Sequence, residues 1–426
     1  MSPLTPAQLT TLAAACTDHA PKPPSPPRPI SIWEITSWIL PMAPEHFRRV
    51  LAADPSLPQG VAGAEGGTRW FAPADLGPLR AHFATGPRKA RYQPAYAARA
   101  PLVALTGPMG DMGRTTCLLH LATAAALSGY RILVIDGDPC GRLGRTLPPP
   151  SAFDEGPDNG GPDDRGAEAQ GAGVLSLIAL SAAQHLRRLN EVRLDRGETP
   201  HPMDAVLTAA LTLPAAALIR PSLWPGLDVM AAPPALMQAD LQLAGWRQSL
   251  RNWQPAAALA MALDEGGLRQ RYDLILCDTP RGLGPLALSL LSAADVLLAP
   301  LPEDGLPRLA EGLAALGAAA SQAEAEALQT ARALGQTAAP QLWQSLLVLP
   351  TRTGSTRLPA GFAAKLGDSL LPAALPEIPG LGSNLGPDLA QFYDLDYRHI
   401  GRLAYAPLRS ACDAAWATLA SALQRA

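Results

Sequence analysis

The chain has 426 residues, 48% of them hydrophobic, and a formal net charge of −3 at pH 7. Its length and apolar content predict a large domain with a smaller one attached, and its small net charge excludes a protein that is basic throughout. The five cysteines lack metal-like spacing, and neither a leader segment nor an apolar run of about 18 residues is apparent. We therefore expect a reduced, cytoplasmic protein without a spanning helix.

The N-terminal part predicts a tail followed by a small helical module. Residues 1–29 end in PKPPSPPRP, which cannot form a regular helix, so we expect a disordered proline-rich tail. Within residues 30–91, the segments SIWEITSWIL and APEHFRRVLAADP predict two helices, GAEGGTRWF a hairpin, and PADLGPLRAHFA another helix. This order favours a winged helix-turn-helix module in which Arg48, Arg49 and Arg69 contact DNA phosphates. An ordinary solvated helical subdomain is the alternative.

Residues 101–141 predict a strand, a glycine-containing loop, a helix and a second strand. Three glycines turn the loop and three polar residues open the helix: Gly107, Gly110 and Gly113, then Arg114, Thr115 and Thr116. Backbone N–H groups in such a loop, together with the helix N-terminus, attract an anion, so a nucleoside triphosphate is the expected ligand. Two positions depart from the common pattern, because Arg114 replaces the usual lysine and Asp111 adds a carboxylate near the phosphates.

Acidic residues follow two of the predicted strands. The strand RILVID ends in Asp136 and is followed by Asp138, and the strand YDLILCDTP carries Asp278. We expect Asp278 and the Thr115 hydroxyl on the Mg²⁺ side of the site. One of Asp136 and Asp138 could orient the attacking water while the other supports Mg²⁺; capped turns are the plainer interpretation.

The remainder of the chain predicts one large domain over residues 99–426. Residues 148–172 are rich in Asp, Glu, Gly and Pro and predict a disordered acidic insertion. Beyond it, the apolar runs PGLDVMAA, DVLLAPL and SLLVLPTR alternate with helical stretches. Runs of this kind are typical of parallel strands covered on both faces, so the predicted fold is doubly wound α/β with a mostly parallel sheet.

Several of these segments resemble a known family. MGDMGRTTCLLHLATAAALSGYRILVIDGDPCGRL resembles the deviant phosphate loop and acidic strand of ParA partition ATPases, and CDTPRGLGPLALSLLSAADVLLAPL resembles their second acidic motif and switch. IRPSLWPGLDVMAAPPALMQADLQL, LPTRTGSTRLPAGFAAKLGDSLLP and QFYDLDYRHIGRLAYAPLRSACDAAWATL look like segments of the RepA type from RepABC replicons, which also carries an N-terminal helix-turn-helix. The resemblance covers most of residues 30–424.

The resemblance implies a nucleoid-associated ATPase that uses ATP and Mg²⁺, dimerises around ATP and then binds DNA non-specifically. It also implies a ParB/RepB-like centromere-binding partner and repression of its own operator. Carried over by position, the family's motifs fall on five phosphate-loop residues, a water-positioning acid, a magnesium-side acid and an adenine-side residue: Gly110, Gly113, Arg114, Thr115 and Thr116, then Asp138, Asp278 and Arg352.

Three loop residues depart from the family pattern. Met109 stands where ParA proteins carry a signature lysine that reaches the partner subunit's nucleotide, Asp111 replaces a glycine, and Arg114 replaces the loop lysine. Arginine keeps the charge of lysine but is bulkier and planar. We therefore predict nucleotide binding with weakened hydrolysis.

Two other interpretations stay open. A pseudo-ATPase could act through its N-terminal module as a DNA-binding repressor or scaffold. A membrane-cycling ATPase of the MinD type would need a basic amphipathic terminal helix. The last segment, LRSACDAAWATLASALQRA, has only Arg409 and Arg425 as cations, and it predicts a helix packed on the sheet.

Overall fold

The computed structural model describes residues 26–63, 68–85, 92, 94, 97–107, 112–150, 173–250, 252–333, 343–354, 361–378, 381 and 391–425. Residues 1–25 of the predicted tail and residues 151–172 of the predicted insertion lie outside the described residues. Met109, Gly110 and Asp111 of the predicted phosphate loop also lie outside them.

An eight-stranded sheet forms the centre of the molecule, in the order β11-β10-β9-β4-β8-β5-β7-β6. Its strands are β4 (Leu102–Leu105), β5 (Ile132–Asp136), β6 (Arg220–Pro221), β7 (Leu227–Met230), β8 (Leu274–Asp278), β9 (Val296–Leu301), β10 (Ser345–Thr353) and β11 (Leu375–Pro376). The strand pairs are parallel except β6 with β7, which is antiparallel. The predicted doubly wound, mostly parallel α/β fold is confirmed.

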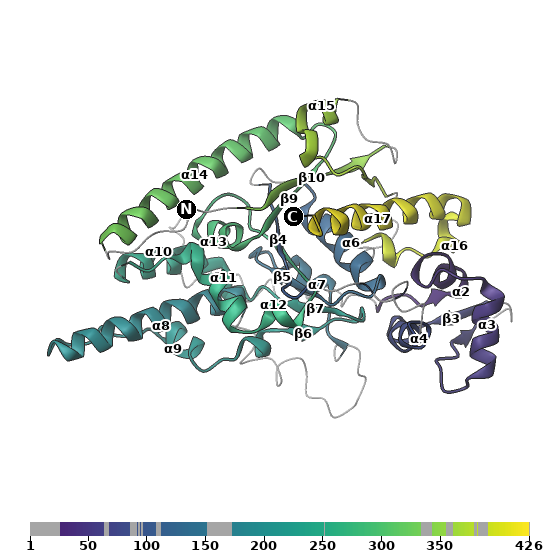
Figure 1. The fold of residues 1–426 in the computed structure, drawn as a ribbon, viewed down its shortest axis with the longest axis horizontal. Helices are drawn as coiled ribbons and strands as arrows, with labels where there is room; N and C mark the ends of the chain where they lie inside the picture. The colour runs from purple at the N-terminus through teal and green to yellow at the C-terminus, as the bar shows by residue number, and fades with distance from the viewer. Residues whose placement is uncertain are drawn as a thin grey trace, which may run out of the picture.

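Helices cover both faces of this sheet (Figure 1). One face packs against α6 (Arg114–Leu127), α7 (Arg142–Thr146) and α17 (Arg402–Leu423). The other packs against α8 (Val174–Asp195), α9 (Ala205–Ala210), α10 (Ala239–Ser249), α11 (Pro255–Glu265), α12 (Leu268–Arg271), α13 (Pro285–Ala293) and α14 (Leu306–Ala333). Alternate side chains of one strand enter the two cores: Ile132 and Val134 enter the first, and Leu133 and Ile135 the second.

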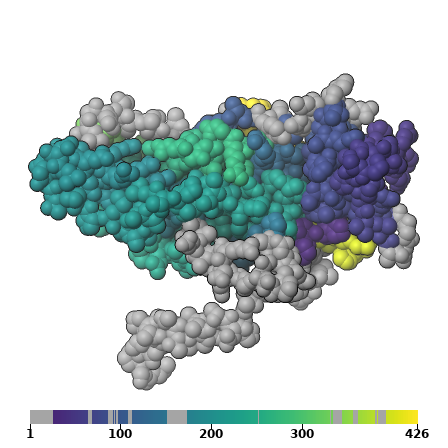
Figure 2. Space-filling view, turned by 90° about the horizontal axis from the view of Figure 1, so that it is seen from below, coloured from purple at the N-terminus to yellow at the C-terminus, as the bar shows by residue number. Residues whose placement is uncertain are grey.

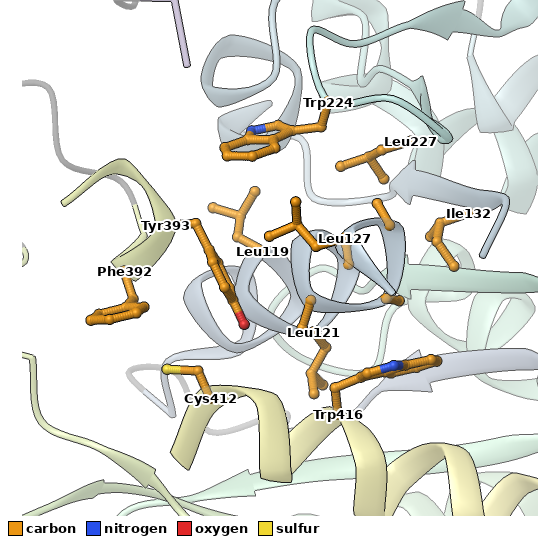
Figure 3. Close-up of a cluster of buried hydrophobic side chains, with 14 of the residues drawn as sticks. Leu119, Leu121, Leu127, Ile132, Trp224, Leu227, Phe392, Tyr393, Cys412 and Trp416 are labelled. Atoms are coloured by element: carbon orange, nitrogen blue, oxygen red, sulfur yellow. The ribbon is translucent and has the colours of Figure 1, made fainter. Parts of the chain in front are cut away.

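The predicted terminal helix is present as α17, and it packs on α6. Figure 3 shows Cys412 and Trp416 of α17 and Phe392 and Tyr393 of the short helix η8 (Phe392–Asp394) around α6. The helix therefore covers α6 and, through it, the sheet. Among the described residues, no helix combines the length and apolar character needed to cross a membrane.

The N-terminal module contains two helices, a strand hairpin and a third helix in the predicted order, together with a first strand that the sequence does not predict. These are β1 (Ile30–Ser31), α2 (Ile32–Glu34) continued by the π-helical turn η1 (Ile35–Ile39), α3 (Pro44–Ala53), β2 (Val61–Ala62), β3 (Arg69–Phe71) and α4 (Leu76–Phe83). The strands form an antiparallel sheet in the order β1-β3-β2. Phe47 lies between Phe71 and Phe83, with ring centroids 5.8 and 5.7 Å away, so helices and sheet share one small core.

The module lies at one end of the molecule, beside α16 (Tyr397–Ile400) and the start of α17 (Figures 1 and 2). Figure 2 shows it opposite the teal segment that contains α8 and α9. Arg28, which lies within the predicted tail, forms an ion pair with Glu34 at 2.6 Å. The sequence alone does not reveal this ion pair, and the tail boundary at residue 29 stays a prediction.

Candidate nucleotide-binding site

The ends of three neighbouring strands bring the predicted loop and acids together. β8 lies between β4 and β5, and Asp136 is the register partner of Asp278. The chain winds from β4 through β5 to β7, returns to β8, and continues beyond β4 to β9 and β10. Ligands of doubly wound sheets bind where the winding reverses, at the carboxyl ends of the strands.

The described end of the phosphate loop is held by backbone geometry and by one buried side chain. Gly113 has a φ of +73°, a left-handed conformation that strains any residue with a Cβ, and it is the N-cap of α6. Met112 is buried in a small core with Leu301 and Val348. The first N–H groups of α6 have no partner within the helix, so they can bind an anion.

Thr115 and Asp278 form the closest polar contact of the site. The Thr115 hydroxyl donates to Asp278 Oδ2 at 2.6 Å, and the Gly144 N–H donates to Asp136 Oδ2 at 3.1 Å. The second oxygen of each carboxylate, Oδ1, is buried and has no hydrogen-bond partner among the described residues. Two adjacent acidic oxygens thus lack the partners that buried polar atoms normally have.

Burial raises the pKa of both carboxyls. The pKa of Asp136 rises to about 7 and that of Asp278 to about 6, and each carboxylate also disfavours ionisation of its neighbours. A cation between them would reverse this effect. Asp138 lies just beyond β5 and accepts the Cys140 N–H at 2.9 Å, so it forms a capped turn as well as standing near the site.

Arg114 lies inside the site and contacts the segment after β8. Its side chain donates to the Pro280 carbonyl at 3.1 Å and to the Thr279 hydroxyl at 3.4 Å. The Thr279 hydroxyl in turn donates to the Leu105 carbonyl at 2.6 Å. The pKa of Arg114 lies below its ordinary value because the side chain is buried. The nearby carboxylates of Asp278 and Asp138 offset only part of this effect. Arg114 therefore connects the start of α6 to the segment that resembles the family's switch.

Arg352 stands beside Gly113. It lies at an irregularity in the β10–β11 pairing, between Thr351 and Thr353, and its φ of +52° is unusual for arginine and costs on the order of 1 kcal/mol. Its Nη2 and Nε atoms lie 3.7 and 3.8 Å from the place that a Cβ on Gly113 would occupy. The flanking Thr351 and Thr353 hydroxyls are buried without partners among the described residues. A second guanidinium thus lies at the phosphate loop.

The oxygen atoms of the site suit a magnesium ion that is bound together with a nucleotide. Among the described residues, no group of three or more His, Cys, Asp or Glu side chains could hold a metal. Mg²⁺ commonly binds through one or two carboxylates together with substrate phosphates. Asp278, Asp136 and the Thr115 hydroxyl provide the oxygen atoms, and the two unpartnered Oδ1 atoms are able to bind a cation.

The three predicted DNA-contacting arginines lie in the N-terminal module, apart from this site (Figure 1). Arg48 and Arg49 are exposed on α3, and Arg48 is 3.8 Å from Glu45. Arg69, on β3, donates to the Gln59 carbonyl at 2.9 Å. The structure therefore places two of the three cations on one exposed helix and the third on the strand hairpin.

Sequence reasoning missed Arg220. This residue, on the short strand β6, donates to the Leu147 and Gly144 carbonyls, at 2.7 Å each. It thereby holds the segment whose Gly144 N–H binds Asp136. No motif marks Arg220, because its partners are backbone atoms more than 70 residues away.

Gly137 permits the close approach of β5 and β8 at the site. A Cβ at this position would lie 2.6 Å from the Asp278 carbonyl oxygen and would also collide with Leu290. We expect Gly137→Ala to lower the free energy of unfolding by about 2 kcal/mol, as overpacking does. Urea denaturation checks this. Gly354→Ala is the control, because a Cβ there meets nothing within 4 Å; equal losses in both variants would contradict the argument.

The sheet order, the loop before α6 and the paired acids are those of an α/β domain with a phosphate loop. Residues 103–372, more than half of the chain, match the family model of the CobQ/CobB/MinD/ParA nucleotide binding domain. The chain belongs to this family. The matched range contains β4 to β10, and so every described residue of the candidate site.

The individual relatives are distant. The chromosome-partitioning ATPase Soj of Thermus thermophilus is 26% identical over 290 residues, which cover 68% of this chain and 88% of Soj. Protein SopA of Escherichia coli is 24% identical over 205 residues, covering 48% of this chain but only 42% of SopA. A solved partition protein, 15% identical, gives a TM-score of 0.48 over 87% of this chain and 91% of that one.

Proposed function

We propose that this chain is a ParA-like partition protein, an ATP-dependent DNA-binding switch whose hydrolysis is weakened. The observation that carries the proposal is the pair of buried carboxylates, Asp136 and Asp278, each with an unpartnered oxygen, together with the contact of Asp278 with Thr115 at the start of α6. Such a pair is costly without a cation, and Mg²⁺ bound together with ATP would provide one.

The residues of the site divide the proposed work. Thr115, Asp278 and Asp136 would hold Mg²⁺, which when bound supplies positive charge to the phosphate oxygens. The phosphates would bind to the backbone of the loop, at Gly110 and Gly113, and to the helix N-terminus at Thr116. Arg114 and Arg352 add two guanidinium groups, which bind phosphate oxygens in pairs. The proximity of Arg352 to Gly113 supports a phosphate contact in addition to, or instead of, the adenine-side role.

Weakened hydrolysis follows from the chemistry of the loop. Asp138 is the proposed acid that orients the attacking water. Met109 carries no charge to stabilise the partner's nucleotide, and Asp111 adds like charge beside the phosphates. Losing one such transition-state contact typically slows an enzyme by on the order of a hundredfold. Nucleotide binding without rapid turnover would make a long-lived switch.

The proposal extends to DNA and to partners. Arg48 and Arg49, exposed on α3, support contacts with DNA phosphates, and Arg69 on the hairpin would add another. By resemblance to the RepA type, we propose a homodimer, a ParB/RepB-like centromere-binding partner, operator repression, and a nucleoid-associated place in the cytoplasm. The domain limits, 30–91 for the DNA module and 99–426 for the ATPase domain, belong to the same proposal.

Binding of a fluorescent ATP analogue with Mg²⁺ tests the proposal, followed by phosphate release with and without DNA. We expect wild-type protein to bind, Arg114→Ala to bind at least about tenfold more weakly, and Asp278→Ala to lose its dependence on Mg²⁺. Arg308→Ala is the matched control, because Arg308 pairs with Asp304 at the surface. The proposed switch would be refuted if the wild-type protein did not bind the analogue, or if Arg114→Ala bound it as tightly as the wild-type protein.

A pseudo-ATPase that acts as a DNA-binding repressor or scaffold is the second candidate. The loop substitutions Met109 and Asp111 favour it, and so does the exposure of Arg48 and Arg49 on α3. In that case Asp278→Ala would retain DNA binding and plasmid retention, whereas Arg48→Ala with Arg49→Ala would lose both.

A further inference from the structure

A continuous path of buried contacts joins the start of α6 to the N-terminal module. It begins at His120, two turns into α6. Its Nε2 accepts the Phe392 backbone N–H at 3.0 Å, and its Nδ1 lies 2.7 Å from the Thr116 carbonyl oxygen. This pattern assigns the neutral tautomer with hydrogen on Nδ1, and burial lowers the pKa of His120 to about 4. His120 thus ties the phosphate-binding helix to the segment at residue 392.

A second hydrogen bond strengthens this tie. One turn further along α6, the Thr123 hydroxyl donates to Gln391 Oε1 at 2.7 Å. Both partners are buried, with exposed fractions of 1% or less. Figure 3 shows Phe392 and Tyr393 beside α6 and above Cys412 of α17. A displacement of α6 along its axis would therefore carry residues 391 and 392 with it or break both bonds.

The path continues from Phe392 into the N-terminal module. The rings of Phe392 and Tyr405 have centroids 4.8 Å apart. The Tyr405 hydroxyl donates to Glu34 Oε1 at 2.8 Å, although the two residues are 371 positions apart in the chain. Arg28 donates to Glu34 and, at 2.9 Å, to the Tyr405 hydroxyl. We call Arg28, Glu34 and Tyr405 the joint.

Within the joint, both oxygens of the Glu34 carboxylate accept hydrogen bonds. Ser31 donates both its N–H and its hydroxyl to Glu34 Oε2, at 3.1 and 3.0 Å, so the carboxylate accepts from three residues in all. Removing one hydrogen-bond donor from a buried carboxylate lowers the free energy of unfolding by about 1–3 kcal/mol. Packed interfaces can switch between discrete arrangements, so the contact between Tyr405 and Glu34 could serve as such a two-state element.

We propose that this path couples nucleotide binding at the phosphate loop to the seating of the N-terminal module on the joint. The proposal rests on the proposed function, because it requires that phosphates bind at the start of α6. Nucleotide would stabilise the arrangement of α6 in which His120 and Thr123 hold residues 391 and 392, and so keep Tyr405 against Glu34. Coupling between two sites is reciprocal, so the seated module would favour nucleotide equally.

Amide hydrogen exchange of residues 30–53, with and without Mg²⁺ and a non-hydrolysable ATP analogue, tests the coupling. In wild-type protein we expect the analogue to slow exchange by about tenfold, within the usual range of coupling energies. Tyr405→Phe keeps the ring but loses the hydroxyl that meets Glu34. In this variant, at saturating analogue, the exchange ratio should fall toward one, and because the coupling is reciprocal the affinity for the analogue should fall by no more than about tenfold.

Tyr393→Phe is the matched control. Tyr393 is equally buried, and its hydroxyl donates to a carboxylate, Asp413, at 2.9 Å, but that carboxylate lies on α17 and not in the module. This variant should keep the wild-type ratio. His120→Gln, which can still accept the Phe392 N–H, should retain more of the effect than His120→Leu.

Three outcomes would overturn the coupling. Tyr405→Phe could keep the wild-type ratio, Tyr393→Phe could lose it equally, or the wild-type protein could bind the analogue without any change in exchange. In the last case the proposed nucleotide binding stands and only the coupling fails. If the wild-type protein binds no analogue, the coupling and the proposed switch fail together.

Discussion

At pH 8 and without Mg²⁺, Asp136→Asn should be more stable than the wild-type protein by on the order of 3 kcal/mol. Burial raises the pKa of Asp136 from its ordinary 3.8 to about 7. At pH values between 3.8 and about 7, Asp136 keeps its proton in the folded state and loses it in the unfolded state. Wild-type stability should therefore fall as the pH rises from about 4 to about 7, and asparagine removes this loss.

Urea denaturation at pH 5 and at pH 8 measures the effect. The gain from Asp136→Asn should be about one third of its full size at pH 5 and near its full size at pH 8. Asp304→Asn, at a position exposed to solvent, is the control and should follow the wild-type protein at both values. Saturating Mg²⁺ and ATP analogue should restore wild-type stability at pH 8, since a cation favours the ionised pair. An equal gain at both pH values would show that burial of the charge is not the cause.

Arg269→Met should lower the free energy of unfolding by about 3 kcal/mol, because it leaves buried acceptors without their donor. Arg269 is almost entirely buried at the opposite, amino-terminal edge of the sheet. Its guanidinium donates to Asp295 at 2.5 Å and to the Ala100 and Ala293 carbonyls at 3.0 and 3.3 Å. Its Nε lies 3.5 Å from Asp264.

Methionine fills a similar volume, so the expected loss comes from the hydrogen bonds and not from a cavity. Thermal or urea unfolding of Arg269→Met against Arg308→Met measures it. Arg308 forms an ion pair at the surface, and its loss should change stability by less than about 0.5 kcal/mol. A loss below 1 kcal/mol in Arg269→Met would mean that the network contributes little.

Much of the sheet could be predicted from the sequence, because its central strands are short apolar runs; the two-residue strands β6 and β11 carry no such signal. Asp136 and Asp278 were predicted at strand ends for the same reason. The apolar pattern of a strand is visible within a few consecutive residues, and the topology of doubly wound sheets then brings the carboxyl ends of the strands together.

What the sequence does not reveal depends on contacts between distant residues. The direction of the Arg114 side chain is set by Thr279 and Pro280, some 165 residues away. The contact between Tyr405 and Glu34 joins the two ends of the chain, and no periodicity marks it. The contacts of Arg28 with these two residues were not predicted for the same reason.

Both edges of the central sheet end in a strand of two residues that includes a proline: β6 with Pro221 and β11 with Pro376. Proline has no N–H to offer to a further strand, and a strand this short exposes little backbone. The sheet is therefore protected against growth by edge-to-edge addition of another copy. We therefore expect copies of this protein that associate through the α/β domain to use its helical faces or the loops at the strand ends, and not a continuous intermolecular sheet.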